Sequence, residues 1–391
     1  MLNQAKSAAA GVLLGAMFFG VMAASTACAQ EIKIGVTIST TGPAASLGLP
    51  QQLSIGLLPN EVAGRKIQYI VRDDASDTTK AVANVRRLVE EDSVDAIIGS
   101  STTPVSLAMI DVAAEKQVPM MSLGASQAII SPMDAKKRWV FKMPQNDSLM
   151  ADAITEHMAA NGVKTVAFIG YADAYGDGWL RETQRAFAAS NIKLVAIERY
   201  NRTDTSVTGQ IAKIITAQPD AVLIVASGTP AVLPQKTLHE LGYTGKFYQT
   251  HGAANLDFLR VGGQDVEGTI LPAGPLVVAK DLPDDHPAKA EALAYIAGFE
   301  KANGAGSVAF GSYAYDAGLL LQHAAPVALK KANPGTLEFR QALRDALENV
   351  KDLAVTNGVM TMTADNHNGL DKRARLMLTI EHGAWKLLPQ K

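Results

Sequence analysis

Residues 96–115, AIIGSSTTPVSLAMIDVAAE, contain the pattern that decides the fold of this chain. The apolar run at 96–98 is typical of a buried strand, and residues 105–115 have the length and composition of a helix. Between them lies the loop 99–104, in which a run of serines and threonines leads into the helix. A strand, a polar loop at its carboxyl end and a helix form one unit of a doubly wound α/β sheet.

The same alternation of short β-branched runs and longer amphipathic runs continues on both sides of this unit. Before it, the pattern predicts strands at 32–38 and 67–71 and a helix at 80–91. After it comes a strand at 120–122 and then a second series. That series contains strands at 165–169, 193–197, 221–225 and 247–249, and helices at 148–161, 177–190, 207–217 and 231–241. Two such series predict two doubly wound lobes with parallel sheets.

The chain is expected to pass between these lobes more than once. Residues 140–145 join the two series without turn glycines, which predicts a crossing strand. After residue 275 the pattern becomes helical and then ends in short strands. We therefore expect lobe 1 over 30–145 plus 275–356 and lobe 2 over 146–274 plus 357–391, with a hinge between them.

The first 29 residues have the composition of an export signal. An early lysine precedes an apolar stretch at 8–24, and Ala27-Cys28-Ala29 places small residues at a cleavage site. The apolar stretch is shorter than the ~20 residues of a membrane span. We therefore expect a periplasmic mature protein of about 360 residues. Lipid anchoring at Cys28 is the alternative, but the residue three positions earlier is not the bulky aliphatic of lipoprotein signals.

The overall composition excludes several classes of function. With 36 basic and 38 acidic side chains the net charge is −2, so neither nucleic acid nor an anionic membrane is an expected partner. The motifs of common hydrolases, phosphate-loop enzymes and zinc enzymes are absent. We therefore expect no enzymatic activity, no cofactor and no metal. The acidic residues Asp73, Asp74 and Asp77 could hold a cation, but a solvated turn after a strand needs none.

Further polar, glycine-rich loops follow other predicted strands. The carboxyl ends of parallel strands meet at one edge of a sheet, where ligands bind. A hydroxyl-rich loop that leads into a helix N-terminus presents free N–H groups and suits a carboxylate. The alternative is that these residues only cap helices. Besides 99–104, the loops are 39–43 and 123–126 in the first lobe, and 171–178, 226–229 and 250–252 in the second.

Several motifs, taken in order, give the chain a family resemblance. They are Ile32-Lys33-Ile34-Gly35-Val36 leading to Thr41-Gly42-Pro43, Asp73-Asp74-Ala75-Ser76-Asp77, Ile97-Ile98-Gly99-Ser100-Ser101, Tyr175-Gly176-Asp177-Gly178 and Asp204-Thr205-Ser206. Over residues 31–391 the chain resembles the leucine/isoleucine/valine-binding family, the type I periplasmic binding proteins that serve ABC importers. The resemblance implies two Rossmann-like lobes joined by three crossing hinge segments. It also implies a small-molecule ligand, an ABC permease in the inner membrane as partner, and a monomer.

The resemblance further implies where the ligand is held. In the family, hydroxyls and backbone amides of the first lobe bind the ligand carboxylate, and a tyrosine of the second lobe packs on the ligand. These roles carry over to Thr103 and to Tyr175. The expected ligand-binding residues are Leu47, Ser101, Thr102, Thr103, Gly124, Ala125, Ser126, Tyr171, Tyr175, Ser227 and His251.

Departures from the family pattern bear on the ligand. His251 stands where amino-acid binders carry a glutamate that pairs with the ligand ammonium, and Ser227 and Leu47 replace tyrosines. Burying an unpaired ammonium costs several kcal/mol, which argues against a free α-amino acid, although Asp173 could substitute. The change favours a flat carboxylate such as a benzoate or phenylpropanoid and resembles the aromatic-acid-binding branch of the family.

Other interpretations remain open from the sequence alone. A hydrophobic amino acid such as leucine is the alternative ligand, and a sensor for a membrane receptor or a secreted hydrolase is an alternative role. His251 is expected to bond a ring substituent or a second polar group, or else only backbone at the hinge. Residues 48–64 are shorter than the family's first helix, and we expect Pro59 to interrupt that helix and reshape one wall of the pocket.

Overall fold

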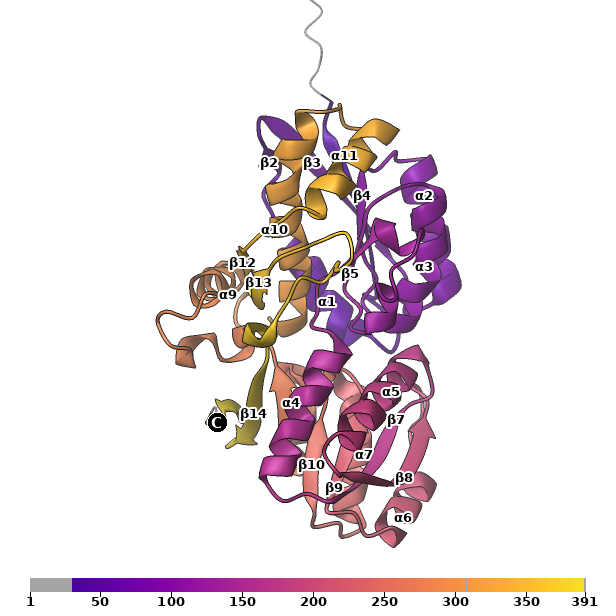
Figure 1. The fold of residues 1–391 in the computed structure, drawn as a ribbon, viewed down its shortest axis with the longest axis vertical. Coiled ribbons are helices and arrows are strands. Elements are labelled where there is room, and N and C mark those ends of the chain that lie inside the picture. Colours follow the sequence, from indigo (N-terminus) through magenta and orange to yellow (C-terminus); the bar gives the residue numbers. More distant parts are fainter. Residues whose placement is uncertain (1–29, 307, 390–391) are drawn as a thin grey trace, which may run out of the picture.

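The computed structural model describes residues 30–306 and 308–389, which form two lobes (Figure 1). The predicted export signal and Cys28 lie outside these residues. Within them, no helix combines the length and the hydrophobicity needed to cross a membrane. The predicted α/β fold with two sheets is confirmed, because each lobe contains its own largely parallel sheet.

The first lobe is built on a sheet with the order β2-β3-β1-β4-β5-β6. From β3 to β6, all neighbouring strands in this order run parallel. Only β2, which pairs with β3, is antiparallel. Helices α2 and α3 cover one face, and α1, α10 and α11 cover the other. The strands are β1 (Ile32–Ile38), β2 (Glu61–Val62), β3 (Arg65–Asp73), β4 (Ala96–Gly99), β5 (Met120–Ser122) and β6 (Val140–Lys142); the helices are α1 (Ala45–Ile55), α2 (Thr78–Glu90), α3 (Thr103–Glu115), α10 (Ala309–Leu329) and α11 (Leu337–Leu347).

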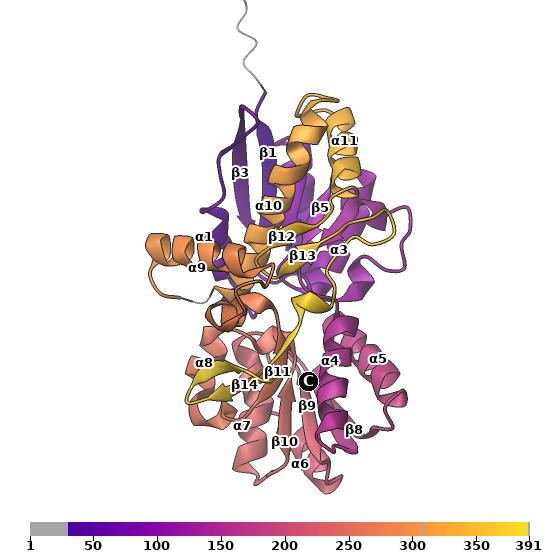
Figure 2. The same ribbon diagram turned by 60° about the vertical axis from the view of Figure 1, so that its left-hand side comes forward.

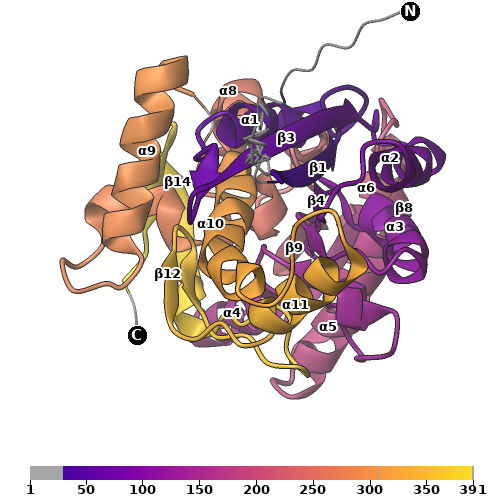
Figure 3. The same ribbon diagram turned by 90° about the horizontal axis from the view of Figure 1, so that it is seen from above.

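Both faces of this sheet are buried at its centre, and this explains why the strands β4 and β5 are almost entirely apolar. Ile97 and Met120 pack toward α2 and α3, whereas Ile98 and Met121, one residue further along each strand, pack toward α10. Helix α9 (Lys289–Asn303) lies on the side of the molecule opposite α2 and α3 (Figure 3).

The second lobe has the sheet order β15-β14-β11-β10-β9-β7-β8. Strands β7 to β11 run parallel to one another, β14 adds antiparallel to β11, and β15 adds antiparallel to β14. The strands are β7 (Thr165–Tyr171), β8 (Lys193–Tyr200), β9 (Ala221–Val225), β10 (Lys246–Gln249), β11 (Ile270–Ala273), β14 (Leu376–Glu381) and β15 (Ala384–Leu387); the helices are α4 (Asp147–Ala160), α5 (Ala174–Ala188), α6 (Thr208–Thr216), α7 (Val232–Glu240) and α8 (Leu256–Gly262).

Three segments carry the chain between the lobes (Figure 2). The first joins β6 to α4, the second leaves β11 toward α9 and α10, and the third enters β14. Gln145, in the first crossing, donates to the Ala374 carbonyl in the third at 3.0 Å and accepts from the Tyr313 hydroxyl at 2.9 Å. The first and third crossings are therefore hydrogen-bonded to each other, and the first is also bonded to α10.

Two local expectations are wrong. The chain was expected to return to lobe 2 at residue 357, yet Met360 and Met362 pack in the first lobe's core next to the hairpin β12 (Leu353–Val355) and β13 (Gly358–Met360). Pro59 does not interrupt the first helix, because α1 ends at Ile55 before that proline is reached.

Candidate functional site

A cavity lies where the two lobes meet. Most of the predicted ligand-binding residues line it, which places hydroxyl, aromatic and imidazole groups around one volume. From the prediction, these are Leu47, Ser101, Thr102, Thr103, Ala125, Tyr175, Ser227 and His251. The prediction omitted Leu123, Pro144, Arg202, Gly252, Phe310 and Tyr313, which also line the cavity.

The other three predicted residues stand behind the wall and do not line the cavity. The Ser126 amide donates to Thr103 Oγ1 at 3.2 Å, and the Tyr171 hydroxyl donates to the Ser227 carbonyl at 2.9 Å. Gly124 packs so closely that a Cβ there would lie 2.9 Å from Ile129 Cδ1. Their contacts fix the orientation of residues that do face the cavity.

On the first-lobe side, the wall is the loop that leads into α3. The helix begins at Thr103 with Thr102 as its N-cap residue, so its first amides have no acceptor within the helix and form its positive end. Thr103 Oγ1 accepts from Ser126, and this leaves its hydroxyl proton for a ligand. The Ser101 hydroxyl proton, in contrast, is already used within the protein. This hydroxyl accepts from the Ser39 amide and donates to Gln51 Oε1 at 2.5 Å.

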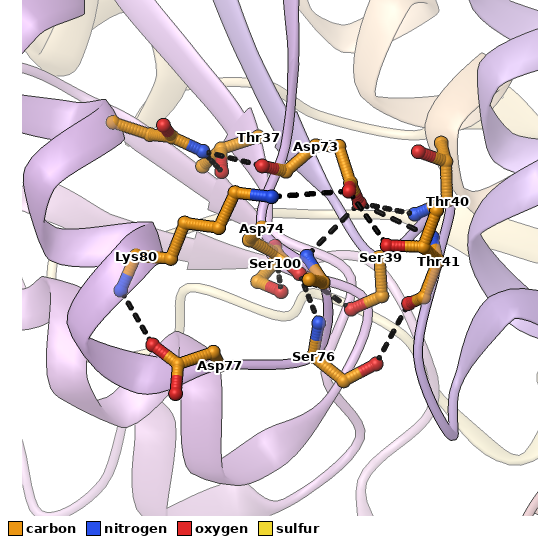
Figure 4. Close-up of polar contacts among 12 residues, drawn as sticks. Thr37, Ser39, Thr40, Thr41, Asp73, Asp74, Ser76, Asp77, Lys80 and Ser100 are labelled. Carbon is orange, nitrogen blue, oxygen red and sulfur yellow. Dashed lines mark hydrogen bonds and ion pairs between the residues drawn. The ribbon is translucent and has the colours of Figure 1, made fainter.

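Two adjacent aspartates at the end of β3 hold this loop and the loop after β1 in place (Figure 4). Asp74 is fully buried and accepts from the hydroxyls of Ser39 at 2.6 Å and Ser100 at 2.7 Å. Asp73 accepts from the amides of Thr40 and Thr41 at 3.0 and 3.2 Å. Protein donors therefore occupy these carboxylates. No group of three or more possible metal ligands occurs among the residues that the structure describes.

On the second-lobe side, Arg202 brings a positive charge to the cavity. Its Nε donates to Asp173 at 2.7 Å, its Nη1 donates to Ser227 Oγ at 3.0 Å, and its guanidinium lies 4.0 Å from the Tyr171 ring centroid. Within the described chain its Nη2 has no acceptor. A fixed guanidinium with free donors is suited to bind a carboxylate.

The same ion pair removes Asp173 as a partner for an amine. One Asp173 oxygen accepts from Arg202, and the other caps α5 by accepting from the amides of Tyr175 and Gly176 at 2.9 and 3.2 Å. The expectation that Asp173 could replace the missing glutamate therefore has no structural support. No carboxylate lines the cavity within the described residues.

His251 is a buried imidazole that lies near the Trp179 ring but has no hydrogen-bond partner in the described residues. Neither ring nitrogen has a hydrogen bond within the described residues, so the alternative of a bond to hinge backbone is not observed. Burial, assisted by the nearby charge of Lys142, lowers the pKa of His251 to about 3, which keeps the ring neutral near pH 7. A neutral imidazole has one donor and one acceptor, and their satisfaction requires a polar group in the cavity.

The remaining wall is apolar and aromatic. The Tyr175 hydroxyl bonds Thr250 Oγ1 at 2.7 Å, and Thr250 itself donates to the Ala226 carbonyl, so the tyrosine donates to the threonine. The Tyr313 hydroxyl donates to Gln145. Both phenol protons are therefore used outside the cavity. The rings, together with Phe310 and Leu47, provide a surface for an apolar ligand group.

Comparisons with known proteins are consistent with this architecture. A model of the periplasmic binding protein family matches residues 31–378. An extracellular ligand-binding receptor from Rhodopseudomonas palustris HaA2 is similar to this chain at 46% identity, covering 92% of this chain and 100% of that one, with a TM-score of 0.90. Leu/Ile/Val-binding protein homolog 3 of Brucella melitensis is 24% identical over 66% of this chain and 72% of that protein. A solute-binding protein of an ABC transporter from R. palustris, solved in complex with benzoate, shares the fold at 21% identity and a TM-score of 0.79, covering 92% of this chain and 96% of that one.

Proposed function

Because this chain belongs to the periplasmic binding protein family, we propose that it captures a small carboxylate between its lobes for an ABC importer. The preferred ligand is an aromatic acid such as a benzoate or a phenylpropanoid. The protein acts as the extracytoplasmic solute-binding component and binds its ligand without catalysing a reaction.

One observation carries the choice of ligand class. The cavity has positive groups on both sides, with the start of α3 in the first lobe and Arg202 in the second, and its described wall has no carboxylate. A free amino acid would place its ammonium in this cavity without an anionic partner, at a cost of several kcal/mol. A ligand with a carboxylate and no amine avoids that cost.

The apolar wall and His251 support an aromatic body with a second polar group. The rings of Tyr175, Phe310 and Tyr313 can pack on a flat ligand. The unpartnered nitrogens of His251 can bond a ring substituent. The benzoate complex of the R. palustris solute-binding protein shows that the same fold accommodates an aromatic carboxylate in a neighbour.

Isothermal titration calorimetry of the mature protein at pH 7 tests the proposal. The panel contains benzoate, cinnamate and 4-hydroxycinnamate, with leucine and isoleucine as the competing class. We expect micromolar or tighter binding of at least one aromatic acid, which corresponds to about −8 kcal/mol or better, and no heat with the amino acids. Micromolar leucine binding without a response to any aromatic acid would overturn the choice of ligand.

A further inference from the structure

A lysine is buried directly behind the wall of the cavity. Lys142, the last residue of β6, has no exposed surface, and its Nζ donates to the Pro144 carbonyl oxygen at 2.6 Å. Pro144 lines the cavity, so the ammonium lies one residue behind it. An ammonium has three protons to donate, and the described residues supply this one acceptor.

The charge of Lys142 is poorly compensated by the protein. No acidic group of the described chain lies within ion-pair distance of it. Asp147, at the start of α4, attracts it from further away, but the Asp147 carboxylate already accepts from Ser126 and from the Gln127 amide. A buried cation in this position gains from any negative charge that enters the cavity.

Of the titratable groups that line the cavity, Arg202 is charged and paired with Asp173, whereas His251 and the two phenols are neutral. His251 faces the lysine from the second lobe and is uncharged, because burial lowers the pKa of that imidazole to about 3. Burial raises the pKa values of the two phenols that line the cavity, Tyr175 and Tyr313. On the next segment, the His367 ring bonds the Val140 carbonyl at 2.8 Å, at the other end of β6. A ligand carboxylate would therefore be the main new charge that Lys142 experiences.

We propose that Lys142 is a positioning residue that acts through Pro144 to make the cavity select anionic ligands, and that the lysine gains a proton when a carboxylate binds. This inference rests on the proposed function, since it requires a carboxylate in the cavity. It assigns a role to a buried charge that contributes no ion pair to the fold.

The direction of the pH dependence follows from the charge balance. With the lobes in contact and no ligand in the cavity, burial lowers the pKa of Lys142 to about 7, so the lysine is charged at pH 6 and mostly neutral at pH 8.5. A bound carboxylate favours the charged form and raises this pKa. Ligand binding is therefore accompanied by almost no proton uptake at pH 6, and by uptake of a measurable fraction of a proton per ligand at pH 8.5. Affinity for the acid falls as the pH rises above 7, by at most about tenfold per unit.

Calorimetry of the mature protein with benzoate and cinnamate, and with their neutral amides, tests the inference. Titrations at pH 6 and pH 8.5 in buffers of different ionisation enthalpy measure proton uptake by the wild type without any substitution. We expect uptake only at pH 8.5. In Lys142→Met, the affinity for the acid at pH 6 should fall about tenfold and lose its pH dependence, whereas the affinity for the amide should be unchanged.

Lys116→Met is the control, because Lys116 is a partly exposed lysine that pairs with Glu90 on the surface of lobe 1. It should keep the wild-type affinity and pH profile. Lys142→Gln provides a second variant if the methionine protein does not fold. Acid binding without proton uptake, or an unchanged pH slope in the Lys142 variants, overturns this inference alone. Failure of the wild type to bind either acid overturns the proposed function and this inference with it.

Discussion

Arg202 is the residue on which the electrostatic character of the cavity depends most. Its stacking on Tyr171 and its bonds to Asp173 and Ser227 hold the guanidinium in one orientation before any ligand is present. A charge fixed in advance loses little side-chain entropy on binding, which increases its contribution to affinity. Asp173 cancels part of the charge, and Nη2 still has donors available.

Removing this guanidinium should weaken the binding of an aromatic acid. We expect Arg202→Gln to lower the affinity for benzoate or cinnamate 10- to 100-fold, because a hydrogen bond to a charged group contributes about 1.5–3 kcal/mol. Arg202→Lys should recover part of the loss, since it keeps the charge but not the forked donors. Calorimetry at pH 7 measures both. Arg185→Gln, at a half-exposed arginine paired with Glu182, should bind like the wild type. Equal affinity in Arg202→Gln would contradict this role.

At the scale of elements, the start of α3 and the loop before it form the first-lobe wall, and β3 holds that loop through Asp74. The carboxylate accepts from Ser39 and Ser100, which belong to the loops after β1 and β4, and from the Ser76 amide. One side chain thus connects three strand ends at the edge of the sheet (Figure 4). This edge is where ligands bind in such sheets.

Truncating Asp74 should affect both stability and binding. Asp74→Ala leaves two hydroxyls and an amide without their acceptor in a buried region, and we expect a loss of about 3 kcal/mol in the free energy of unfolding by urea. The affinity for the acid should also fall, because Ser101 and Thr103 lie on the loop that loosens. Asp77→Ala removes only the cap of α2, where the carboxylate accepts from the Lys80 amide, and should cost about 1 kcal/mol without changing affinity. Similar losses in the two variants would argue against the special role of Asp74.

The elements that the sequence predicts well are those with a strong local pattern. The buried strands β1, β5 and β9 have the predicted limits, and in β1 and β5 the apolar run stops at Ser39 and Ser122. Strand β11 was not predicted, since Pro272 interrupts its pattern and its pairing with β14 joins distant parts of the chain. Helix α8 contains only seven residues, too few to establish a helical period.

The residues of the candidate site likewise divide into those that local sequence predicts and those that it does not. Thr103 and His251 follow predicted strands, so the rule that ligands bind at strand ends finds them. Arg202 also follows a strand, β8, but its direction depends on Tyr171 and Asp173, which local sequence does not relate to it. Phe310 and Tyr313 reach the cavity on α10, after the chain has returned through the second crossing. Such contacts depend on tertiary structure and have no local signal.

At the scale of the whole molecule, the two lobes touch around the cavity. A Cβ on Gly228 of the second lobe would lie 2.4 Å from Ser46 Oγ of the first, and a Cβ on Gly178 would lie 2.7 Å from Ser126 Oγ. Glycine therefore allows the lobes to approach at both points. If this arrangement is the ligand-bound one, side chains at these positions should oppose closure, and ligand affinity should report it.

Gly178 permits a test in which stability and affinity change independently. It lies inside α5, where alanine is a better helix former by up to about 1 kcal/mol, so Gly178→Ala should not lower the melting temperature of the empty, open protein. In the closed form the added methyl also meets Ser126 of the first lobe, whose hydroxyl is fixed by its hydrogen bond to Asp147. Overpacking of this kind costs about 1–3 kcal/mol, so we expect at least a fivefold loss of affinity for the aromatic acid. Gly209→Ala on α6, where a Cβ meets nothing, should leave affinity unchanged. If Gly178→Ala binds as tightly as the wild type, the contact between Gly178 and Ser126 is not part of the ligand-bound state.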